Sequence, residues 1–359
     1  MKSLYKVGWY GAALVLPLIA QSTYVGHIAA PRAGAAYYLA VSLLLTAIQI
    51  GQAAAFQVTL AHRGSYQISK RLSRGLMVIA TVAISLALTP GLAMPVKSGA
   101  IIVLGIGIGS LFSVRNAHLL NAGTEVIYFR KLFLRNALVL GLCVSIANLV
   151  AKPGMPHIAA IAFATLLFSM HRLRPPAKET RDQSLTLSSK DLATMGIGIA
   201  AASLYRNDQN LVRSFSLSTA AFASVHNSLL GGSAIQSLVG AVLTTFILPK
   251  VREQSAAPGL RLVLDASAML FFVALCLVAT LYDTPTITIL CGSAILAINQ
   301  WWSYKLHLRS KSIYVYLSGT FAFALLSALL AAGIRVELSY FLFAIVTSLS
   351  VLTLGYVVR

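Results

Sequence analysis

The feature that most constrains this chain is a series of long apolar runs that carry almost no charge. A helix needs about 20 mostly apolar residues to cross a bilayer, because it rises 1.5 Å per residue through a hydrocarbon layer roughly 30 Å thick. Twelve such runs follow one another, and we predict that each forms a transmembrane α-helix. They cover residues 7–31, 33–62, 75–96, 98–114, 136–151, 153–171, 192–205, 214–249, 266–282, 284–304, 312–334 and 338–358.

Composition excludes an ordinary soluble protein. Hydrophobic residues make up 58% of the 359 positions and charged residues only 10%, whereas soluble domains carry about 25% charged residues. The first run follows Lys2 and Lys6 and could be mistaken for a secretion signal. Because its charge-free stretch is longer than the usual signal core of about 7–15 residues, we read it as a retained first helix.

The distribution of basic residues predicts the orientation. Counting Lys and Arg in alternate loops and at the termini gives 21 on one side of the membrane, 4 on the other and 3 in or beside the runs. Cytoplasmic loops of membrane proteins carry the excess of Lys and Arg. We therefore expect both termini in the cytoplasm, the loops touching anionic lipid, and no need to invoke nucleic acid for the net charge of +19.

A polar stretch at the middle of the chain predicts two lobes of six helices each. Residues 171–191 are mostly polar and include Pro175 and Pro176. We expect an N-terminal lobe over 1–173, a cytoplasmic linker over 174–190 and a C-terminal lobe over 191–359.

A short internal repeat fits this division. The tripeptide at 47–49, Ala-Ile-Gln, recurs at 234–236. An even number of spans gives both halves the same orientation, so the all-α fold is expected to have two lobes related by a pseudo-twofold axis along the membrane normal.

The most informative polar cluster is Arg206-Asn207-Asp208-Gln209-Asn210, which we place in the outer half of the seventh span, with Arg213 following. Ionisable residues inside a membrane are costly and usually face a cavity or the interior of a helix bundle. The cluster therefore predicts a binding site for an anionic group, with Asp208 balancing Arg206 or titrating. The alternative is that this span ends early and the cluster forms an exposed turn.

Other polar residues inside or beside the runs are weaker candidates. We expect Arg115 and Asn116 either to line the cavity or to reach the interface. We expect Asp265 either to carry a coupling ion or to pair with a nearby base such as Arg261. Uncharged amides in spans often bond helix to helix instead of binding substrate. The further cavity candidates are Gln49, Gln236 and Asn299.

No enzyme constellation is visible in the sequence. The three cysteines lie in apolar runs without disulfide or metal-ligand spacing, so we expect neither a metal nor a cofactor. Gly105, Gly107 and Gly109 lie inside a span with no strand before them, so they do not predict a nucleotide site. The Gly105/Gly109 spacing favours close helix packing.

Several segments resemble one known superfamily. They are the turn at 26–34, the turn Leu120-Asn121-Ala122-Gly123, the acidic Asp208, and Pro249-Lys250-Val251 at the end of the eighth span. With twelve spans in two lobes, the chain resembles the multidrug/oligosaccharidyl-lipid/polysaccharide (MOP) exporter superfamily, and within it the bacterial O-antigen and exopolysaccharide flippases.

The resemblance implies a function. It implies that the chain flips an undecaprenyl-diphosphate-linked glycan across the bacterial inner membrane by alternating access, alongside polysaccharide polymerase and chain-length machinery. Arg115, Arg206 and Arg213 would attract the diphosphate, and Asp208 or Asp265 would carry a coupling ion. The alternatives are a cation-coupled drug antiporter of the same superfamily, or a membrane enzyme such as a polymerase or acyltransferase.

Overall fold

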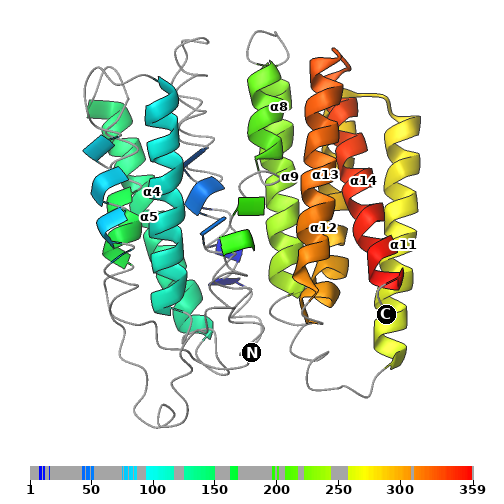
Figure 1. Cartoon of the computed structure of the whole chain (residues 1–359), viewed down its shortest axis with the longest axis horizontal. Coiled ribbons are helices and arrows are strands. Elements are labelled where there is room, and N and C mark those ends of the chain that lie inside the picture. The colour runs from blue at the N-terminus through cyan, green and yellow to red at the C-terminus, as the bar shows by residue number, and fades with distance from the viewer. Residues whose placement is uncertain are drawn as a thin grey trace. The chain divides into compact units, whose positions relative to one another are not determined.

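In the computed structural model, the described residues form helices joined by short turns (Figure 1). Its labelled helices are α4 (Met94–Asn116), α5 (Glu125–Leu149), α8 (Asp208–Ser216), α9 (Phe222–Val242), α11 (Pro258–Leu281), α12 (Pro285–Leu308), α13 (Ser312–Ala331) and α14 (Val336–Val357). The described residues are 8–9, 11–12, 16, 43–44, 46–48, 50–51, 75, 77–79, 81–83, 85–86, 94–116, 125–149, 162–168, 196–198, 200–201, 207–216, 222–243, 258–308 and 311–357.

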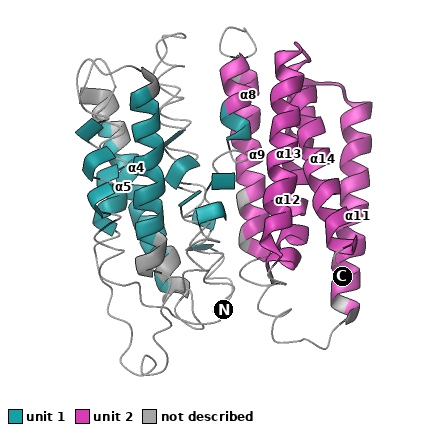
Figure 2. Cartoon of the chain, viewed as in Figure 1, with its two compact units in different colours: residues 1–210 teal, residues 211–359 magenta. Residues whose placement is uncertain are grey.

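The chain divides into two compact units, Met1–Asn210 and Leu211–Arg359 (Figure 2). The division falls within α8, because the first three residues of that helix belong to the first unit. The expected linker, 174–190, lies outside the described residues, so the predicted lobe boundaries stay a prediction.

The second unit is built around α12, which packs most extensively against α14 and α9 and also contacts α11 and α13. Its core is made of large side chains with almost no exposure, including Ile289 and Ile295 of α12 and Tyr340 and Phe343 of α14. Where helices pack in water, the burial of such side chains is the main favourable contribution to the free energy of packing. Where helices pack in lipid, van der Waals contact between the side chains drives the packing instead.

The helix α11 exposes its apolar side chains to the surroundings. Leu270, Phe271 and Leu281 are 72%, 64% and 77% exposed. An apolar surface of this extent marks contact with a membrane or a partner. Among the described residues, Arg261–Leu281, Ser312–Ala331 and Val336–Val357 are long and apolar enough to cross a membrane. The predicted runs 266–282, 312–334 and 338–358 are thereby confirmed as helices of membrane-spanning length, and the chain is a multi-pass membrane protein.

The end of α13 shows how the sequence stops one of these helices. Gly333 has φ +75°, a left-handed conformation that costs glycine little. Its amide donates to the Leu330 carbonyl at 3.1 Å, and the Ile334 amide donates to the Leu329 carbonyl at 3.1 Å. This pair of bonds is a Schellman motif, and it satisfies carbonyls at the helix end before α14 begins.

In the first unit, glycines let α4 approach the helical residues 43–44, 46–48 and 50–51. A Cβ at Gly105 would stand 2.5 Å from the Ala47 Cβ, and a Cβ at Gly109 would collide with the Ile48 backbone. The contact is reciprocal, since a Cβ at Gly51 would collide with α4. The prediction that Gly105 and Gly109 serve close helix packing is confirmed.

One predicted loop in the first unit is wrong. Arg130, Lys131 and Arg135 fall between the predicted runs 98–114 and 136–151 and are among the 21 basic residues counted in the loops, but α5 begins at Glu125 and contains all three. Hydropathy underestimates such a helix, because the long apolar stems of Lys and Arg let charged residues continue a helix past the apolar run.

Candidate functional site

The predicted polar cluster of the seventh span lies at the start of α8. Asn207 forms a turn, and Asp208 is the first residue of the helix. An acidic residue in the first turn is favoured there by the helix dipole. Asp208 and Asn210 are buried, at 8% and 6% exposure, so these two residues are not part of an exposed turn. Arg206 lies outside the described residues.

Asn210 is held on both sides by side chains of the first unit. Its Nδ2 donates to Oδ1 of Asn207 at 2.9 Å and to Oγ1 of Thr46 at 3.2 Å. One amide nitrogen therefore connects the start of α8 to Thr46. Asn210 was predicted to bind substrate, and this bond shows that it also holds the start of α8 in place.

Two basic side chains meet inside the second unit. Arg213 of α8 is 3% exposed, and His226 of α9 is 1% exposed. Nε of Arg213 donates to Nδ1 of His226 at 3.4 Å. Because Nδ1 accepts, this geometry corresponds to a neutral imidazole whose proton is on Nε2. A guanidinium group and an imidazole ring are thus held against each other in a buried position.

Sequence reasoning predicted Arg213 but missed His226. The available signal was its position, since His226 lies within the otherwise charge-free run at 214–249. A histidine at membrane depth is by default a candidate for function.

Gln236 belongs to a network of hydrogen bonds between helices. Its Nε2 donates to the Tyr340 hydroxyl at 3.5 Å, and that hydroxyl shares a 3.3 Å hydrogen bond with Ser293. Nε2 of Gln300 donates to the Gln236 carbonyl at 3.0 Å. The network joins α9, α12 and α14, so the structure gives Gln236 the helix-bonding role that amides in spans often have.

Glycines on α9 make room for this network. A Cβ at Gly232 would collide with the Ser293 side chain, and one at Gly240 would stand 2.6 Å from Oε1 of Gln300. Asn299, another predicted site residue, is 8% exposed on α12, and its Oδ1 accepts no hydrogen bond from the described residues.

Asp265 is bound to the neighbouring helix α12. Nζ of Lys305 lies 2.7 Å from Oδ2 of Asp265, and Nε1 of Trp301 donates to Oδ1 at 2.9 Å. The base that the structure shows at this carboxylate is Lys305, 40 positions away along the chain. The alternative reading of Asp265 as a paired carboxylate is therefore the one that the structure supports, with a different base.

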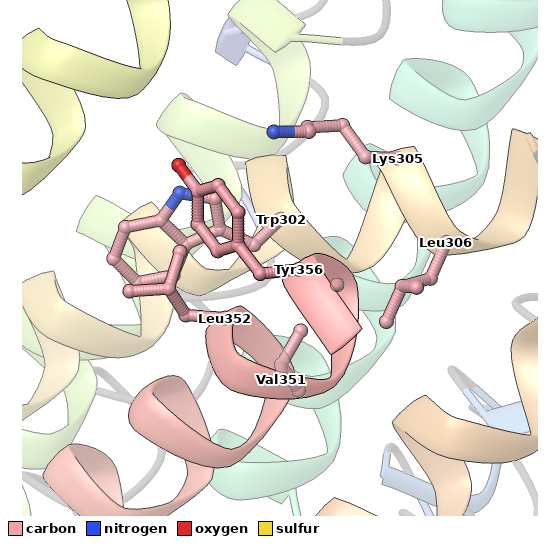
Figure 3. A pocket seen from close by; sticks show the side chains of 7 residues that line it. Trp302, Lys305, Leu306, Val351, Leu352 and Tyr356 are labelled. Atoms are coloured by element: carbon pink, nitrogen blue, oxygen red, sulfur yellow. The ribbon is translucent and has the colours of Figure 1, made fainter. Parts of the chain in front are cut away.

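Lys305 also lines a small pocket where α12 and α14 end. Trp302, Lys305, Leu306, Val351, Leu352, Gly355 and Tyr356 surround it (Figure 3). Trp302 is 2% exposed, and its Nε1 finds no hydrogen-bond partner among the described residues. The pocket is mixed in character, with an ammonium group, two aromatic rings and apolar walls.

The remaining predicted site residues cannot be joined to these groups. Arg115 and Asn116 are the last residues of α4, and their side chains lie outside the described part, as does Gln49. No three His, Cys, Asp or Glu side chains of the described ranges lie close enough to hold a metal ion. The arrangement that stands out chemically is the buried basic pair, because it can attract an anion.

Comparison with known proteins places the fold. No protein-family model and no curated protein matches the chain. Solved structures do match: a MATE in complex with Br-NRF shares 12% identity, with TM-score 0.57, over 99% of this chain and 93% of that one. A MOP superfamily transporter from Pyrococcus furiosus shares 11% identity, with TM-score 0.55, over 99% and 93%.

A third structure is similar over nearly the same length. It is a multidrug resistance MATE family transporter of the MOP superfamily in its outward-facing conformation, with 11% identity and TM-score 0.51 over 98% of this chain and 93% of that one. At identities of 11–12%, the likeness to these structures shows the fold alone. The predicted superfamily resemblance is confirmed at that level: this chain has the fold of the MATE transporters of the MOP superfamily.

Proposed function

We propose that this protein is a MOP-type transporter that moves a polyprenyl-diphosphate-linked oligosaccharide across the bacterial inner membrane. Its twelve helices would form two six-helix lobes, 1–173 and 191–359, joined by a cytoplasmic linker at 174–190. Alternating access would carry the polar head between leaflets while the polyprenyl tail stays in lipid. The fold, which is that of solved transporters, supports the transport part of the proposal.

The observation that carries the choice of substrate is the buried pair Arg213 and His226. A buried basic group raises the electrostatic preference of a site for an anion. Guanidinium is suited to phosphate, since its planar N–H groups can bind two oxygens at once. His226 positions Nε of Arg213, and the guanidinium would bind an incoming diphosphate.

Roles for the other predicted residues follow from the same idea. Arg115 and Arg206 would add positive charge along the path. Asp208, buried one and a half turns before Arg213 on α8, would titrate and couple the cycle to an ion gradient. Polysaccharide polymerase and chain-length machinery would then receive the glycan.

A drug antiporter is the second candidate, and the fold favours it equally. One neighbour is described as a multidrug resistance transporter. The Pyrococcus furiosus neighbour is described as having a binding pocket of reversed polarity, which suggests a different function for it. Within this fold, the sign of the charge in the site therefore separates the two candidates. The buried Arg213 of this chain favours an anion.

Transport into proteoliposomes tests the proposal. The purified protein should move a fluorescent short-chain polyprenyl-diphosphate saccharide, and Arg213→Gln should slow it about tenfold, the effect of losing about 1.4 kcal/mol of a charge-assisted hydrogen bond. Arg213→Lys should fall between the two. Arg261→Gln is the matched control, because Arg261 is exposed on the same unit.

Two results would contradict the proposal. One is unchanged transport by Arg213→Gln at equal protein abundance. The other is a wild-type protein that moves cationic dyes but not the diphosphate, which would establish the antiporter instead. In cells, deletion of the gene should make lipid-linked repeat units accumulate on the cytoplasmic face of the membrane.

A further inference from the structure

The pocket where α12 and α14 end contains a buried indole. Trp302 is 2% exposed, and its Nε1 donates to no acceptor among the described residues. The neighbouring Trp301 differs, because its Nε1 donates to Asp265 at 2.9 Å. A buried N–H group without an acceptor costs free energy. Trp302 therefore offers a hydrogen-bond donor to a ligand of this pocket.

The pocket has a polar side and an apolar side. Figure 3 shows the indole nitrogen of Trp302, the Tyr356 hydroxyl and the Lys305 ammonium group along one side. Val351 and Leu352 of α14 lie along the other side. A molecule that fits this arrangement has a hydrogen-bond acceptor at one end and an apolar body.

The charge of Lys305 is balanced within the protein. Its Nζ lies 2.7 Å from Oδ2 of Asp265, and Lys305 is the charged residue among the seven described residues that line the pocket. We therefore expect the pocket to select its ligand by hydrogen bonding and apolar contact, and not by net charge.

Gly355 leaves space beside this indole. It lines the pocket, and a Cβ at this position would have no atom within 4 Å, so close helix packing does not require the glycine. Gly355 also lacks the left-handed backbone that Gly333 has. Glycine is a poorer helix former than alanine. An open pocket is a reason for this residue that packing and backbone conformation do not supply.

The pocket lies at the level where the oxygen atoms of lipids are found. Lys305 and Gly355 belong to the last turns of α12 and α14, and α14 is long and apolar enough to cross a membrane. Trp and Tyr side chains are enriched at the membrane–water interface, because each has an apolar ring and a polar N–H or O–H group. Ester and phosphate oxygens of lipids accept hydrogen bonds at this depth.

An apolar surface leads away from the pocket along α14. Leu349, Leu352 and Tyr356 are three and four residues apart, so they share one face of the helix. Leu349 and Tyr356 are 42% and 50% exposed. This face can hold an acyl chain that starts at the pocket and runs into the hydrocarbon layer.

We propose that this pocket binds a glycerophospholipid of the surrounding membrane. Nε1 of Trp302 would donate to an ester or phosphate oxygen, and an acyl chain would lie along Leu352 and Leu349. The predicted orientation assigns the site to the cytoplasmic leaflet. The site shares no residue with the proposed path of the transported head group, and the inference does not rest on the proposed function.

The indole N–H resonances test the hydrogen bond directly. The chain has three tryptophans, so the full-length protein labelled with ¹⁵N-tryptophan in detergent micelles should give three indole signals. Titration with dioleoylphosphatidylcholine should shift the signal that Trp302→Phe removes and leave the signal that Trp301→Phe removes. A Trp302 signal that stays in place at saturating lipid would overturn the proposal.

An ether-linked phosphatidylcholine separates the two acceptors. If it leaves the Trp302 signal in place while the ester-linked lipid shifts it, the site is supported and the acceptor is the ester carbonyl. Equal shifts by the two lipids also support the site and assign the hydrogen bond to the phosphate.

Lipid affinity in variants gives an independent test. In native mass spectrometry of the full chain, Trp302→Phe should weaken the tightest bound phosphatidylcholine about five- to tenfold, since it keeps a ring but removes the N–H group. Trp301→Phe is the matched control, because its N–H group is used by Asp265, and it should bind as the wild type does. Equal losses in the two variants would overturn the proposal.

Gly355→Leu keeps the test decisive if Trp302→Phe fails to fold. The new side chain should fill the pocket and weaken lipid binding about tenfold or more, while thermal stability stays the same or rises. Gly259→Leu on α11 is its control, because a Cβ there also meets no atom within 4 Å and Gly259 does not line the pocket. Wild-type affinity in Gly355→Leu, or an equal loss in Gly259→Leu, would overturn the proposal.

Discussion

Nζ of Lys305 lies 2.7 Å from Oδ2 of Asp265, and this ion pair fastens α11 to α12. Both side chains are mostly shielded, at 25% and 19% exposure. Trp301 adds a hydrogen bond from its Nε1 to the same carboxylate. Because α11 otherwise exposes much of its apolar surface, this polar contact helps to fix the position of the helix in the unit.

Asp265→Asn should lower the free energy of unfolding by about 1.5–3 kcal/mol, because it leaves the Lys305 ammonium partly buried without its counter-ion. Lys305→Gln should have a similar effect. The double variant should recover most of the loss, since neither charge is then stranded. Unfolding of the purified protein in mixed micelles by dodecyl sulfate measures all three.

The same variants decide whether Asp265 carries a coupling ion. If the double variant transports with an unchanged dependence on the pH gradient, Asp265 has a structural role, and Asp208 is then the remaining candidate for the coupling residue. If it transports but has lost that dependence, the ion pair is part of the coupling. Arg261→Gln, an exposed change on the same helix, is the control.

Gly109→Ala should destabilise the first unit although alanine is the better helix former. The gain in helix propensity is about 1 kcal/mol, but the new Cβ would collide with the Ile48 backbone, which cannot turn aside as a side chain can. Gly99→Ala on the same helix is the matched control, because nothing lies within 4 Å of its Cβ. Thermal melting should show Gly109→Ala below the wild type and Gly99→Ala at or above it. Equal melting temperatures would contradict the packing role.

Tyr340→Phe should cost about 1–3 kcal/mol, because it leaves the Ser293 hydroxyl and the Gln236 amide without a buried partner. Tyr340 is fully buried, and its ring packs in the core beside Phe343. Tyr282→Phe removes the same hydroxyl from a side chain that is 58% exposed and should change stability little. A stability loss in both variants alike would show that the network contributes nothing specific.

Removing the ion pair between Arg335 and Asp283 should leave stability unchanged. The two side chains are 54% and 69% exposed, and exposed pairs contribute little because water and salt screen them. The hydrogen bond to Asp283 raises the pKa of Arg335, with the charges of Asp283 and Glu337 adding to it. Asp283→Asn should melt with the wild type at low and at high salt.

The sign of that pKa shift fixes the pH dependence. A group whose pKa is raised on folding contributes stability below its unfolded pKa and loses it only as pH rises through the folded value. For an arginine this range lies far above neutral pH. Between pH 5 and 9 the wild type and Asp283→Asn should therefore show parallel stability profiles, and a divergence would assign the pair a larger role.

The sequence was sufficient for the existence of the last four helices, but not for all of their ends. The predicted runs 266–282, 284–304, 312–334 and 338–358 correspond to α11–α14 because hydropathy is a local property, yet α11 begins earlier, at Pro258, and α12 continues to Leu308. The close packing at Gly105 and Gly109 was also readable, because two glycines four apart leave one helix face without side chains.

The sequence alone was not sufficient for the partners of the charged groups. The sequence suggests Arg261 as the partner of Asp265, but the packing of α11 against α12 brings Lys305 to this carboxylate. Hydropathy placed Lys131 and Arg135 between two predicted helices, whereas the structure includes them in α5. His226 stands alone in an apolar run of the sequence, and only the structure shows that it contacts Arg213. Hydropathy is a property of one segment, so the sequence determined which segments are helical. Burial and pairing of a charge depend on which helix faces which, and only the tertiary structure decided that.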